Sequence, residues 1–413
     1  MRKLVILGAG TAGTMVANHL SKHLNKSDWQ ITIIDKDDDH LYQPGLLLLP
    51  FGVYKKDQLI KPRKRQVNER VNFIFSEIEK IEADNNKVIL KSSEEIEYDY
   101  LIVATGTTPR PDQTPGLDDP AIWYRSAFDF YTLEGSVALQ KALENFPGGK
   151  MVVHITELPL KCPVAPLEFA FLADSYFKKR GIRDKVQIHY VTPLEGAFTK
   201  PVCSKTLGYL LEERDIQLET DYVIERIDPE TKTMYSMDER EINFDLLVTV
   251  PLNMGADFIG ASGLGDELNY LPVDKETFLS TDYKNIFALG DASNIPASKA
   301  GSVAHFAVEV FAENFVNYVN NLPMEKKFDG HANCFIESGN GKGLLIDFNY
   351  TTEPLPGKFP LPVVGPMPLL KESHINHLGK LAFRWIYWNM LLPGRKLPIS
   401  TSMQMAGKKK VEG

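Results

Sequence analysis

The sequence predicts an α/β protein in which one parallel-sheet domain is inserted in another, followed by a C-terminal region of different composition. Short apolar runs recur along the chain, each followed by Gly, Pro, Thr or Asp, which is typical of buried parallel strands whose carboxyl ends face ligands. These runs span residues 4–7, 31–34, 100–104, 151–155, 186–191, 246–250 and 286–289. After about residue 330, Gly, Pro and aromatic residues accumulate, and such a segment cannot continue a parallel sheet.

The order of the runs predicts where the domains begin and end. We expect residues 1–110 and 285–330 to form the first domain, and residues 111–284 to form the inserted one. Residues 331–413 then form a C-terminal domain with an amphipathic helix over residues 377–392 that stops at Pro393-Gly394.

The first turn of the chain predicts a dinucleotide site in a Rossmann-like domain. The run at 4–7 ends in Gly8-Ala-Gly10-Thr11-Ala12-Gly13, and residues 11–24 have helical apolar spacing. Gly8 permits the tight turn, Gly10 lets the backbone approach a pyrophosphate, and Gly13 lets the helix pack against the strand. The helix N-terminus then presents free N–H groups to phosphate. Asp35, at the end of the next strand, is placed to bind the adenosine ribose.

Composition excludes several other classes of protein. The formal net charge of −8 argues against nucleic-acid binding, and the short basic segment at 61–65 is predicted to be a solvated loop. Three scattered cysteines, Cys162, Cys203 and Cys334, are too few for a disulfide scaffold or a four-ligand zinc site, so we expect no metal. No signal peptide and no long apolar run is visible, which predicts a chain facing the cytoplasm without a spanning helix.

Two further stretches indicate that the dinucleotide is FAD. Ala104-Thr105-Gly106-Thr-Thr-Pro109-Arg resembles the ATGxxPR motif of flavoproteins with two dinucleotide-binding domains. Residues 285–292, which contain Gly290 and Asp291, resemble their second FAD motif. The resemblance implies that Asp291 binds the ribityl chain, and that Lys36 and Pro44 also contact the cofactor.

The inserted domain lacks the glycine loop with which such flavoproteins bind NAD(P)H. Residues 156–168, directly after the run at 151–155, contain no glycine but contain Cys162 between Lys161 and Pro163. A turn filled with proline and side chains cannot hold a second pyrophosphate in the same way. We therefore expect a donor other than NAD(P)H.

Cys162-Pro-Val-Ala-Pro-Leu-Glu168 resembles the CPxAPxE stretch of the sulfide:quinone oxidoreductases and of the flavocytochrome c sulfide dehydrogenase flavoprotein. The resemblance extends along essentially the whole chain and implies that Cys334 is the second redox cysteine, nearer the flavin. Sulfide can attack a disulfide sulfur, leaving a persulfide on one cysteine and a thiolate on the other that reduces the flavin. Two buried structural cysteines are the alternative.

The same resemblance implies roles for three charged residues. Lys299 and Lys380 match lysines at the pyrimidine end of the flavin, where a cation stabilises the reduced ring. Glu168 is a candidate acid or base for sulfide, or else only a residue of a helix first turn. Cys203 matches no family cysteine, and residues 110–161 lack the third cysteine of many members, which favours a two-cysteine mechanism.

The C-terminal helix is predicted to lie on a membrane surface. Aromatic and apolar residues from Phe383 to Leu392 are flanked by a few cations, as in interfacial helices, although a core helix could show the same pattern. The resemblance implies a pocket for ubiquinone or menaquinone there, with Phe383 beside the quinone ring. The sequence thus predicts a peripheral membrane enzyme on the cytoplasmic face, able to form a homo-oligomer.

Three other functions stay open on the sequence alone. They are a flavoprotein subunit that reduces a cytochrome, a type II NADH:quinone dehydrogenase, and a non-catalytic flavin-binding partner or redox sensor. The missing second glycine loop disfavours the NADH enzyme, and the missing export signal and the aromatic C-terminal helix disfavour the cytochrome partner.

Overall fold

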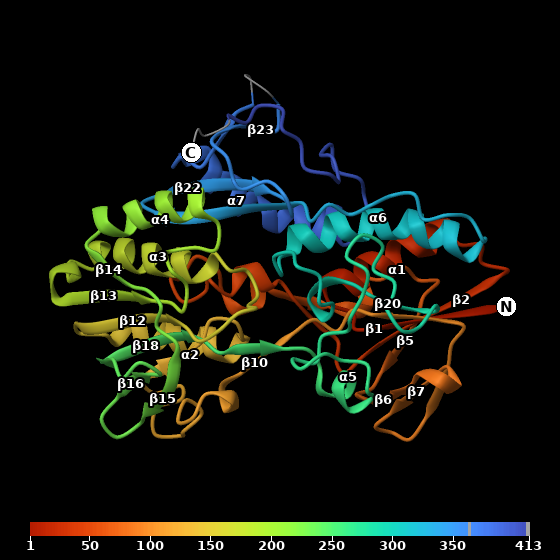
Figure 1. The fold of residues 1–413 in the computed structure, drawn as a ribbon, viewed down its shortest axis with the longest axis horizontal. Coiled ribbons are helices and arrows are strands. Elements are labelled where there is room, and N and C mark those ends of the chain that lie inside the picture. Colours follow the sequence, from red (N-terminus) through yellow and green to blue (C-terminus); the bar gives the residue numbers. More distant parts are fainter. Residues whose placement is uncertain (362–364, 410–413) are drawn as a thin grey trace.

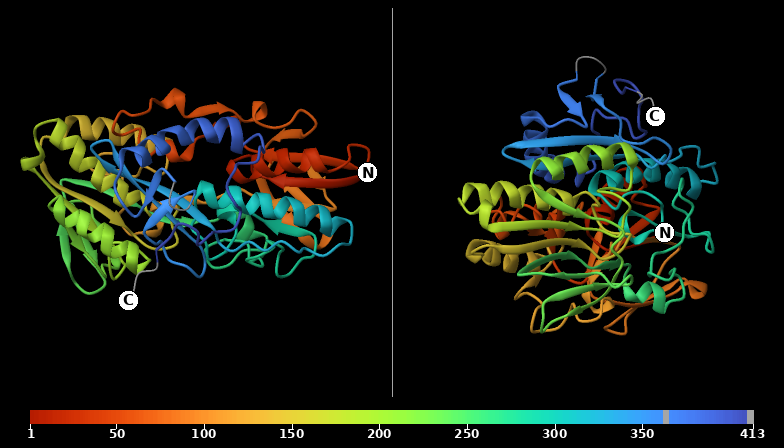
Figure 2. Two further views of the ribbon diagram at one scale, coloured as in Figure 1. Left: turned by 90° about the horizontal axis from the view of Figure 1, so that it is seen from above. Right: turned by 60° about the vertical axis from the view of Figure 1, so that its left-hand side comes forward.

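The computed structural model describes residues 1–361 and 365–409, in which two α/β halves lie side by side and the C-terminal elements lie along one side of both (Figure 1). Residues 362–364 and 410–413 of the predicted C-terminal region lie outside the described residues. Two further views show the C-terminal helix running across the junction of the halves (Figure 2).

The first half is built on a five-stranded parallel sheet in the order β20-β9-β1-β2-β5. Its strands are β1 (Arg2–Leu7), β2 (Trp29–Asp35), β5 (Asn72–Phe75), β9 (Tyr100–Val103) and β20 (Ile286–Ala288). Helices α1 (Thr11–His23) and α6 (Gly301–Val319) pack against each other over this sheet. The apolar residues Leu4 to Leu7 are at most 1% exposed, so this strand is buried on both faces.

The second half repeats this plan with a parallel sheet in the order β11-β18-β12-β13-β14. Its strands are β11 (Ala127–Phe128), β12 (Gly149–Ile155), β13 (Val186–Val191), β14 (Ile216–Glu219) and β18 (Leu246–Val250). Its helices are α2 (Leu133–Asn145), α3 (Ala165–Lys179) and α4 (Pro201–Glu213). Helix α3 packs on β12 and β13, which places its first turn at the carboxyl end of β12.

The chain passes between the halves through a two-stranded antiparallel ribbon. In it β10 (Thr108–Arg110) pairs with β19 (Leu252–Met254), so the segments that leave and re-enter the first half run side by side. Strand β20 then pairs with β9, completing the first sheet after the second half has been made. The predicted fold class, with two Rossmann-like units and one inserted in the other, is confirmed.

Small antiparallel sheets extend both halves and were not predicted. One contains β6 (Ile78–Glu82), β7 (Lys87–Leu90) and β8 (Glu95–Glu97), and the other contains β15 (Ile224–Asp228), β16 (Thr233–Ser236) and β17 (Glu241–Asn243). Strand β6 reads Ile-Glu-Lys-Ile-Glu and buries only Ile81. Because edge strands of this kind have few buried residues, they give a weak sequence signal.

The C-terminal region is a hairpin covered by a helix. Strands β21 (Ala332–Gly339) and β22 (Lys342–Phe348) pair in antiparallel fashion, as do β23 (Gly357–Phe359) and β24 (Met367–Leu369). Helix α7 (His374–Ile386) packs on β21 and β22 and continues as the π-helical turn η8 (Tyr387–Leu391), stopping before Pro393 as predicted. None of the helices in the described ranges is long and apolar enough to cross a membrane.

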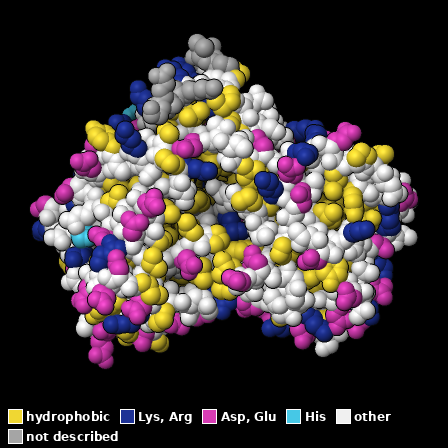
Figure 3. Space-filling view, in the orientation of Figure 1, with side chains coloured by type: hydrophobic (Ala, Val, Ile, Leu, Met, Phe, Trp, Pro, Cys, Tyr) yellow, Lys and Arg dark blue, Asp and Glu magenta, His cyan; other side chains and the backbone are white. Residues whose placement is uncertain are grey.

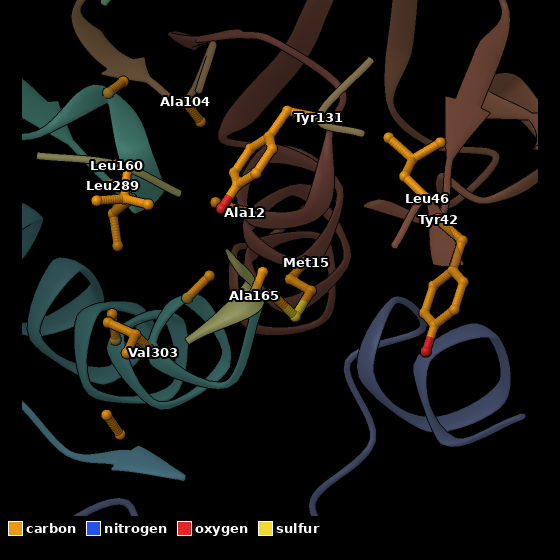
Figure 4. Packing of buried hydrophobic residues seen from close by; sticks show 14 of the residues in the cluster. Ala12, Met15, Tyr42, Leu46, Ala104, Tyr131, Leu160, Ala165, Leu289 and Val303 are labelled. Carbon is orange, nitrogen blue, oxygen red and sulfur yellow. The ribbon is translucent and has the colours of Figure 1, made fainter. Parts of the chain in front are cut away.

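One hydrophobic cluster joins the halves and the C-terminal helix. Met15 of α1, Val303 of α6 and Leu289 lie close to Leu160 and Ala165 of the second half (Figure 4). In the same view the hydroxyl of Tyr42 points toward the C-terminal helix. The centres of the Tyr42 and Tyr387 rings lie 5.0 Å apart. The elements that surround the site described below therefore share one core.

Candidate active site

A cavity of about 720 Å³ lies where the two halves and the C-terminal helix meet. The space-filling view shows the surface hollowed between the halves, with hydrophobic side chains around the hollow (Figure 3). Most of the predicted site residues line the cavity: Gly8, Gly10, Thr11, Ala12, Asp35, Lys36, Pro44, Ala104, Thr105, Gly106, Cys162, Glu168, Gly290, Asp291, Lys299 and Lys380. Gly13, Pro109, Cys334 and Phe383 are not among its lining residues.

The glycine loop has the geometry that its spacing predicts. Gly8 has a φ of +94°, and a Cβ there would lie 2.6 Å from the carbonyl oxygen of Ala104. A Cβ on Gly13 would lie 1.8 Å from the carbonyl oxygen of Gly8, so only glycine lets α1 start this close to β1. A Cβ on Gly10 would meet no atom within 4 Å, which leaves room for a phosphate over the backbone.

We expect the Gly13→Ala variant to lose bound flavin, because the new methyl group displaces the strand that faces the pyrophosphate. The flavin-to-protein absorbance ratio after purification measures this loss. Gly208→Ala is the matched control, since a Cβ at this helical glycine of α4 would have its nearest neighbour 4.0 Å away. The control should keep full flavin content and gain up to about 1 kcal/mol of stability. Equal flavin content in both variants would contradict this account of the loop.

Asp35 at the end of β2 is held at the edge of the glycine loop. Its Oδ2 accepts a hydrogen bond of 2.7 Å from the backbone N–H of Ala9, and the guanidinium of Arg63 contacts its Oδ1. The segment 61–65 is otherwise exposed, but the prediction of a fully solvated loop is wrong for Arg63, which lines the cavity. The Asp35 carboxylate attracts the Arg63 guanidinium toward the cavity. Because the two residues are 28 positions apart in the sequence, composition does not reveal this contact.

Charged groups gather where the two halves meet. The Nζ of Lys299 donates 2.9 Å hydrogen bonds to the carbonyls of Asp291 and Ser293 and lies 3.9 Å from the ring centre of Tyr270. Burial lowers the pKa of Lys299 and that of Lys161, and the charge of Asp291 opposes both shifts. Burial likewise raises the pKa of Asp291, against the effect of the two lysines. These groups form a compact, mutually compensating cluster on the cavity wall.

Cys162 occupies the turn between β12 and α3, where the second domain would otherwise present a nucleotide loop. Its φ of +46° is uncommon for a side chain other than Gly or Asn. The turn is held by a 2.7 Å hydrogen bond from the Cys162 N–H to the carbonyl of Lys299, and by one of 2.8 Å from the Ala165 N–H to the carbonyl of Cys162. Burial raises the pKa of the Cys162 thiol strongly.

Cys334 lies in β21, half-buried behind the cavity wall. Burial raises its pKa to about 11, while the charge of Lys380 and a hydrogen bond with the side chain of Ser302 oppose the shift. Each of Cys162 and Cys334 has a free thiol, and the charge of Cys334 contributes to the raised pKa of Cys162. Cys203, in α4, is fully buried and does not line the cavity, and burial raises its pKa to about 12.

Glu168 and Lys380 form a buried ion pair beside Cys162. The Nζ of Lys380 lies 2.7 Å from Oε1 of Glu168 and also donates to the carbonyl of Phe335 at 3.0 Å. The same Oε1 accepts a 2.7 Å hydrogen bond from the backbone N–H of Glu337, whereas Oε2, among the described residues, has no partner. Burial raises the pKa of Glu168, against the effect of Lys380. The second half, through α3, and the C-terminal region, through α7 and β21, meet in this pair.

Three residues that shape the cavity, His40, Tyr131 and Tyr387, were not predicted as site residues. The Tyr387 hydroxyl lies 2.7 Å from both Oγ1 of Thr11 and Nε2 of His40, which joins the C-terminal helix to the glycine loop. Tyr131 donates to the carbonyl of Cys162 at 3.3 Å. Unlike Thr11, the residues His40, Tyr131 and Tyr387 belong to no motif, and the aromatic content of the C-terminal helix was the one signal for Tyr387.

Comparison with known proteins finds similar sequences and similar folds. Residues 2–144 match the family model described as pyridine nucleotide-disulphide oxidoreductase. The mitochondrial sulfide:quinone oxidoreductase of Dictyostelium discoideum is 28% identical over 400 residues, covering 95% of this chain and 86% of that protein. The crystal structure of the sulfide:quinone oxidoreductase of Aquifex aeolicus has the same fold, with a TM-score of 0.79 and 22% identity over 96% of this chain and 92% of that one.

The chain is an FAD-dependent oxidoreductase. Its resemblance to the sulfide:quinone oxidoreductases spans nearly its whole length. A type II NADH:quinone oxidoreductase of Staphylococcus aureus is also similar, at 24% identity over 86% of this chain and 92% of that protein.

The cavity fits the cofactor on structural grounds. The close-packed Gly8 and Gly13 leave the N-terminus of α1 open to a pyrophosphate, and Asp35, bonded to the Ala9 N–H of the same loop, would bind the ribose. Asp291 and Lys299 would hold the ribityl chain and the ring end, next to Cys162. Bound FAD accepts two electrons as a pair and passes them on singly or together.

Proposed function

We propose that this enzyme oxidises sulfide to zero-valent sulfur or polysulfide through Cys162 and Cys334, and passes the electrons through FAD to a membrane quinone. The observation that supports this most is the position of Cys162. It lines the cofactor cavity at the turn where an NAD(P)H-dependent flavoprotein would need a glycine loop.

The sulfur chemistry balances with the residues present. Hydrosulfide attacks a Cys162–Cys334 disulfide, which forms one S–S bond, breaks another and leaves a persulfide and a thiolate. A second hydrosulfide removes the outer sulfur as a hydrodisulfide, with loss of one proton, so both cysteines become thiolates. The two thiolates re-form their disulfide and release two electrons, which bound FAD would accept. The quinone takes up these two electrons and two protons.

The ion pair of Glu168 and Lys380 suits this reaction. Burial disfavours both thiolates, as their raised pKa values indicate, so the ammonium of Lys380 is the charge that opposes this cost. Glu168 lines the same cavity as Cys162, and its Oε2, which has no partner in the described part of the chain, is available to accept a proton from the substrate. In this proposal Lys380 stabilises the sulfur anions, and Glu168 accepts the protons that the sulfur substrate releases.

The direct test is anaerobic reduction of the purified holoenzyme. Sulfide should bleach the flavin absorbance, and added decylubiquinone should restore it. NADH should leave the spectrum unchanged, because residues 156–164 cannot hold its pyrophosphate as a glycine loop does. Bleaching by NADH and not by sulfide would establish the NADH:quinone oxidoreductase function instead.

We propose that α7 docks the enzyme on a membrane and delivers the quinone. Leu378 is 61% exposed and Trp385 is 62% exposed on this helix, whereas a helix of the core would bury such large apolar side chains. The exposed cations Arg395 and Lys396 follow at its C-terminal end. An apolar face with aromatic and basic residues is what an interfacial helix requires. Phe383, half-buried on the same helix three residues after Lys380, is the residue we propose beside the quinone ring.

A charge on this face should separate the two half-reactions. We expect a Leu378→Glu and Trp385→Glu double variant to lose sedimentation with anionic phospholipid vesicles, and to reduce quinone in vesicles at least about tenfold more slowly. Its flavin should still be bleached by sulfide at the rate of the unaltered enzyme. Met237→Glu is the control, because Met237 is 66% exposed at the loop between β16 and β17, away from α7. Vesicle binding that survives in the double variant would contradict the docking proposal.

A further inference from the structure

A hydrogen-bonded pair, Glu337 and His377, lies next to the buried Glu168–Lys380 pair and reaches toward the surface. Nδ1 of His377 lies 2.9 Å and 3.0 Å from the two carboxylate oxygens of Glu337. The side chain of Glu337 is 3% exposed and that of His377 is 27% exposed. The pair thus has one buried member and one member in contact with water.

The two pairs lie next to each other on the same faces of their elements. His377 and Lys380 are three residues apart on α7, and Phe335 and Glu337 are two residues apart on β21, so each couple shares one face. Lys380 bonds the carbonyl of Phe335, and the N–H of Glu337 bonds the carboxylate of Glu168. The charge of Glu337 also raises the pKa of Lys380.

Protons released at a buried site need a series of acid–base groups that reaches water. Under the proposed function, protons leave sulfide inside a cavity that FAD fills, and the cofactor displaces the water that would otherwise carry them away. An ammonium group has three N–H donors, of which Glu168 and Phe335 accept two in the described part of the chain. The third N–H has no acceptor among the described residues, and the charge of Glu337 acts on the same ammonium group.

We propose that Glu337 and His377 form the proton outlet of the sulfur site. Oε2 of Glu168 receives the proton from the substrate. Lys380 takes a proton from Glu168 as it yields one to Glu337, so that its own charge stays constant. Glu337 passes the proton to His377, whose imidazole releases it to water. Imidazole groups exchange protons readily near neutral pH. This route leaves the proposed roles of the cysteines and of the flavin unchanged, and it rests on the proposed function.

The test measures how fast excess sulfide bleaches the flavin in an anaerobic stopped-flow experiment. We expect His377→Ala and Glu337→Gln to slow bleaching about tenfold or more, since removal of an acid–base group typically costs 10²–10⁴-fold. Free imidazole should restore the rate of His377→Ala in proportion to its concentration. It should not restore Glu337→Gln. Flavin content and the thermal unfolding midpoint check that both variants fold, and His377→Gln replaces His377→Ala if the latter does not.

His374→Ala is the matched control. His374 lies on the same helix and bonds the carbonyl of Gly341, outside the chain of charges, so its loss should leave the rate within about twofold of the unaltered enzyme. Unchanged bleaching in His377→Ala, or slowing that imidazole does not relieve, would overturn the outlet while leaving the proposed function intact. If the unaltered enzyme is not bleached by sulfide at all, the proposed function itself fails.

Discussion

Replacement of Cys162 or of Cys334 by serine is expected to abolish sulfide-dependent quinone reduction, with the bound flavin retained. A serine hydroxyl can neither form the disulfide that hydrosulfide attacks nor hold a persulfide. Loss of the chemical step should lower turnover by at least about 10³-fold, as removal of a covalent nucleophile does. Steady-state assays with sulfide and decylubiquinone measure this, and the visible spectrum of each variant reports its flavin.

Cys203→Ser is the matched control for both cysteine variants. Cys203 is a fully buried residue of α4 that does not line the cavity. Its replacement should cost some stability through the buried hydroxyl, about 1–3 kcal/mol, and leave turnover per bound flavin unchanged. Full activity of Cys334→Ser would show that a two-cysteine mechanism is wrong here. Loss of activity in Cys203→Ser would indicate that the Cys203 thiol also takes part in the reaction.

Removal of Lys380 is expected to have the second largest effect, and it should fall on both stability and activity. Lys380→Met leaves the fully buried carboxylate of Glu168 without its counter-ion, and breaking a buried pair in this way costs about 3–5 kcal/mol. The same change removes the cation that opposes the burial of the two thiolates, so sulfide-dependent bleaching should also slow strongly.

A double-mutant cycle separates the two effects of Lys380. The Glu168→Gln and Lys380→Met double variant has no unpaired charge, so its free energy of unfolding should return to within about 1–2 kcal/mol of the unaltered enzyme. Its activity should stay low, because both the cation and the proton acceptor are missing. Denaturant unfolding followed by fluorescence gives the stability. If the double variant instead loses as much stability as the two single variants lose together, Glu168 and Lys380 are not coupled.

The parts of this site that could be predicted are those built by local chain geometry. Gly8 and Gly13 are required by a turn and by a helix that packs on a neighbouring strand, so a short spacing reveals them. Cys162 is similar, because it stands at a defined place, directly after β12, in a unit whose usual glycine loop is missing. Each of these predictions needs only a segment of the chain and its position after a strand.

The contacts that could not be predicted join residues far apart in the sequence. The hydrogen bond between Thr11 and Tyr387 spans 376 residues, and that between Lys380 and Glu168 spans 212. Their formation depends on how the C-terminal helix packs across both halves, which no local pattern contains. The resemblance pointed to Lys380, but neither its ion pair with Glu168 nor the Glu337–His377 pair follows from a motif.

The proposed reaction of sulfide at the Cys162–Cys334 pair can be detected by peptide mapping with mass spectrometry. The oxidised holoenzyme is treated anaerobically with one equivalent of sulfide, alkylated and digested without reductant. We expect the untreated enzyme to yield a peptide linked through Cys162 and Cys334, and the treated enzyme to carry one additional sulfur atom on one of these two residues. If both cysteines are alkylated as free thiols before sulfide is added, and sulfide still bleaches the flavin, the disulfide mechanism is contradicted.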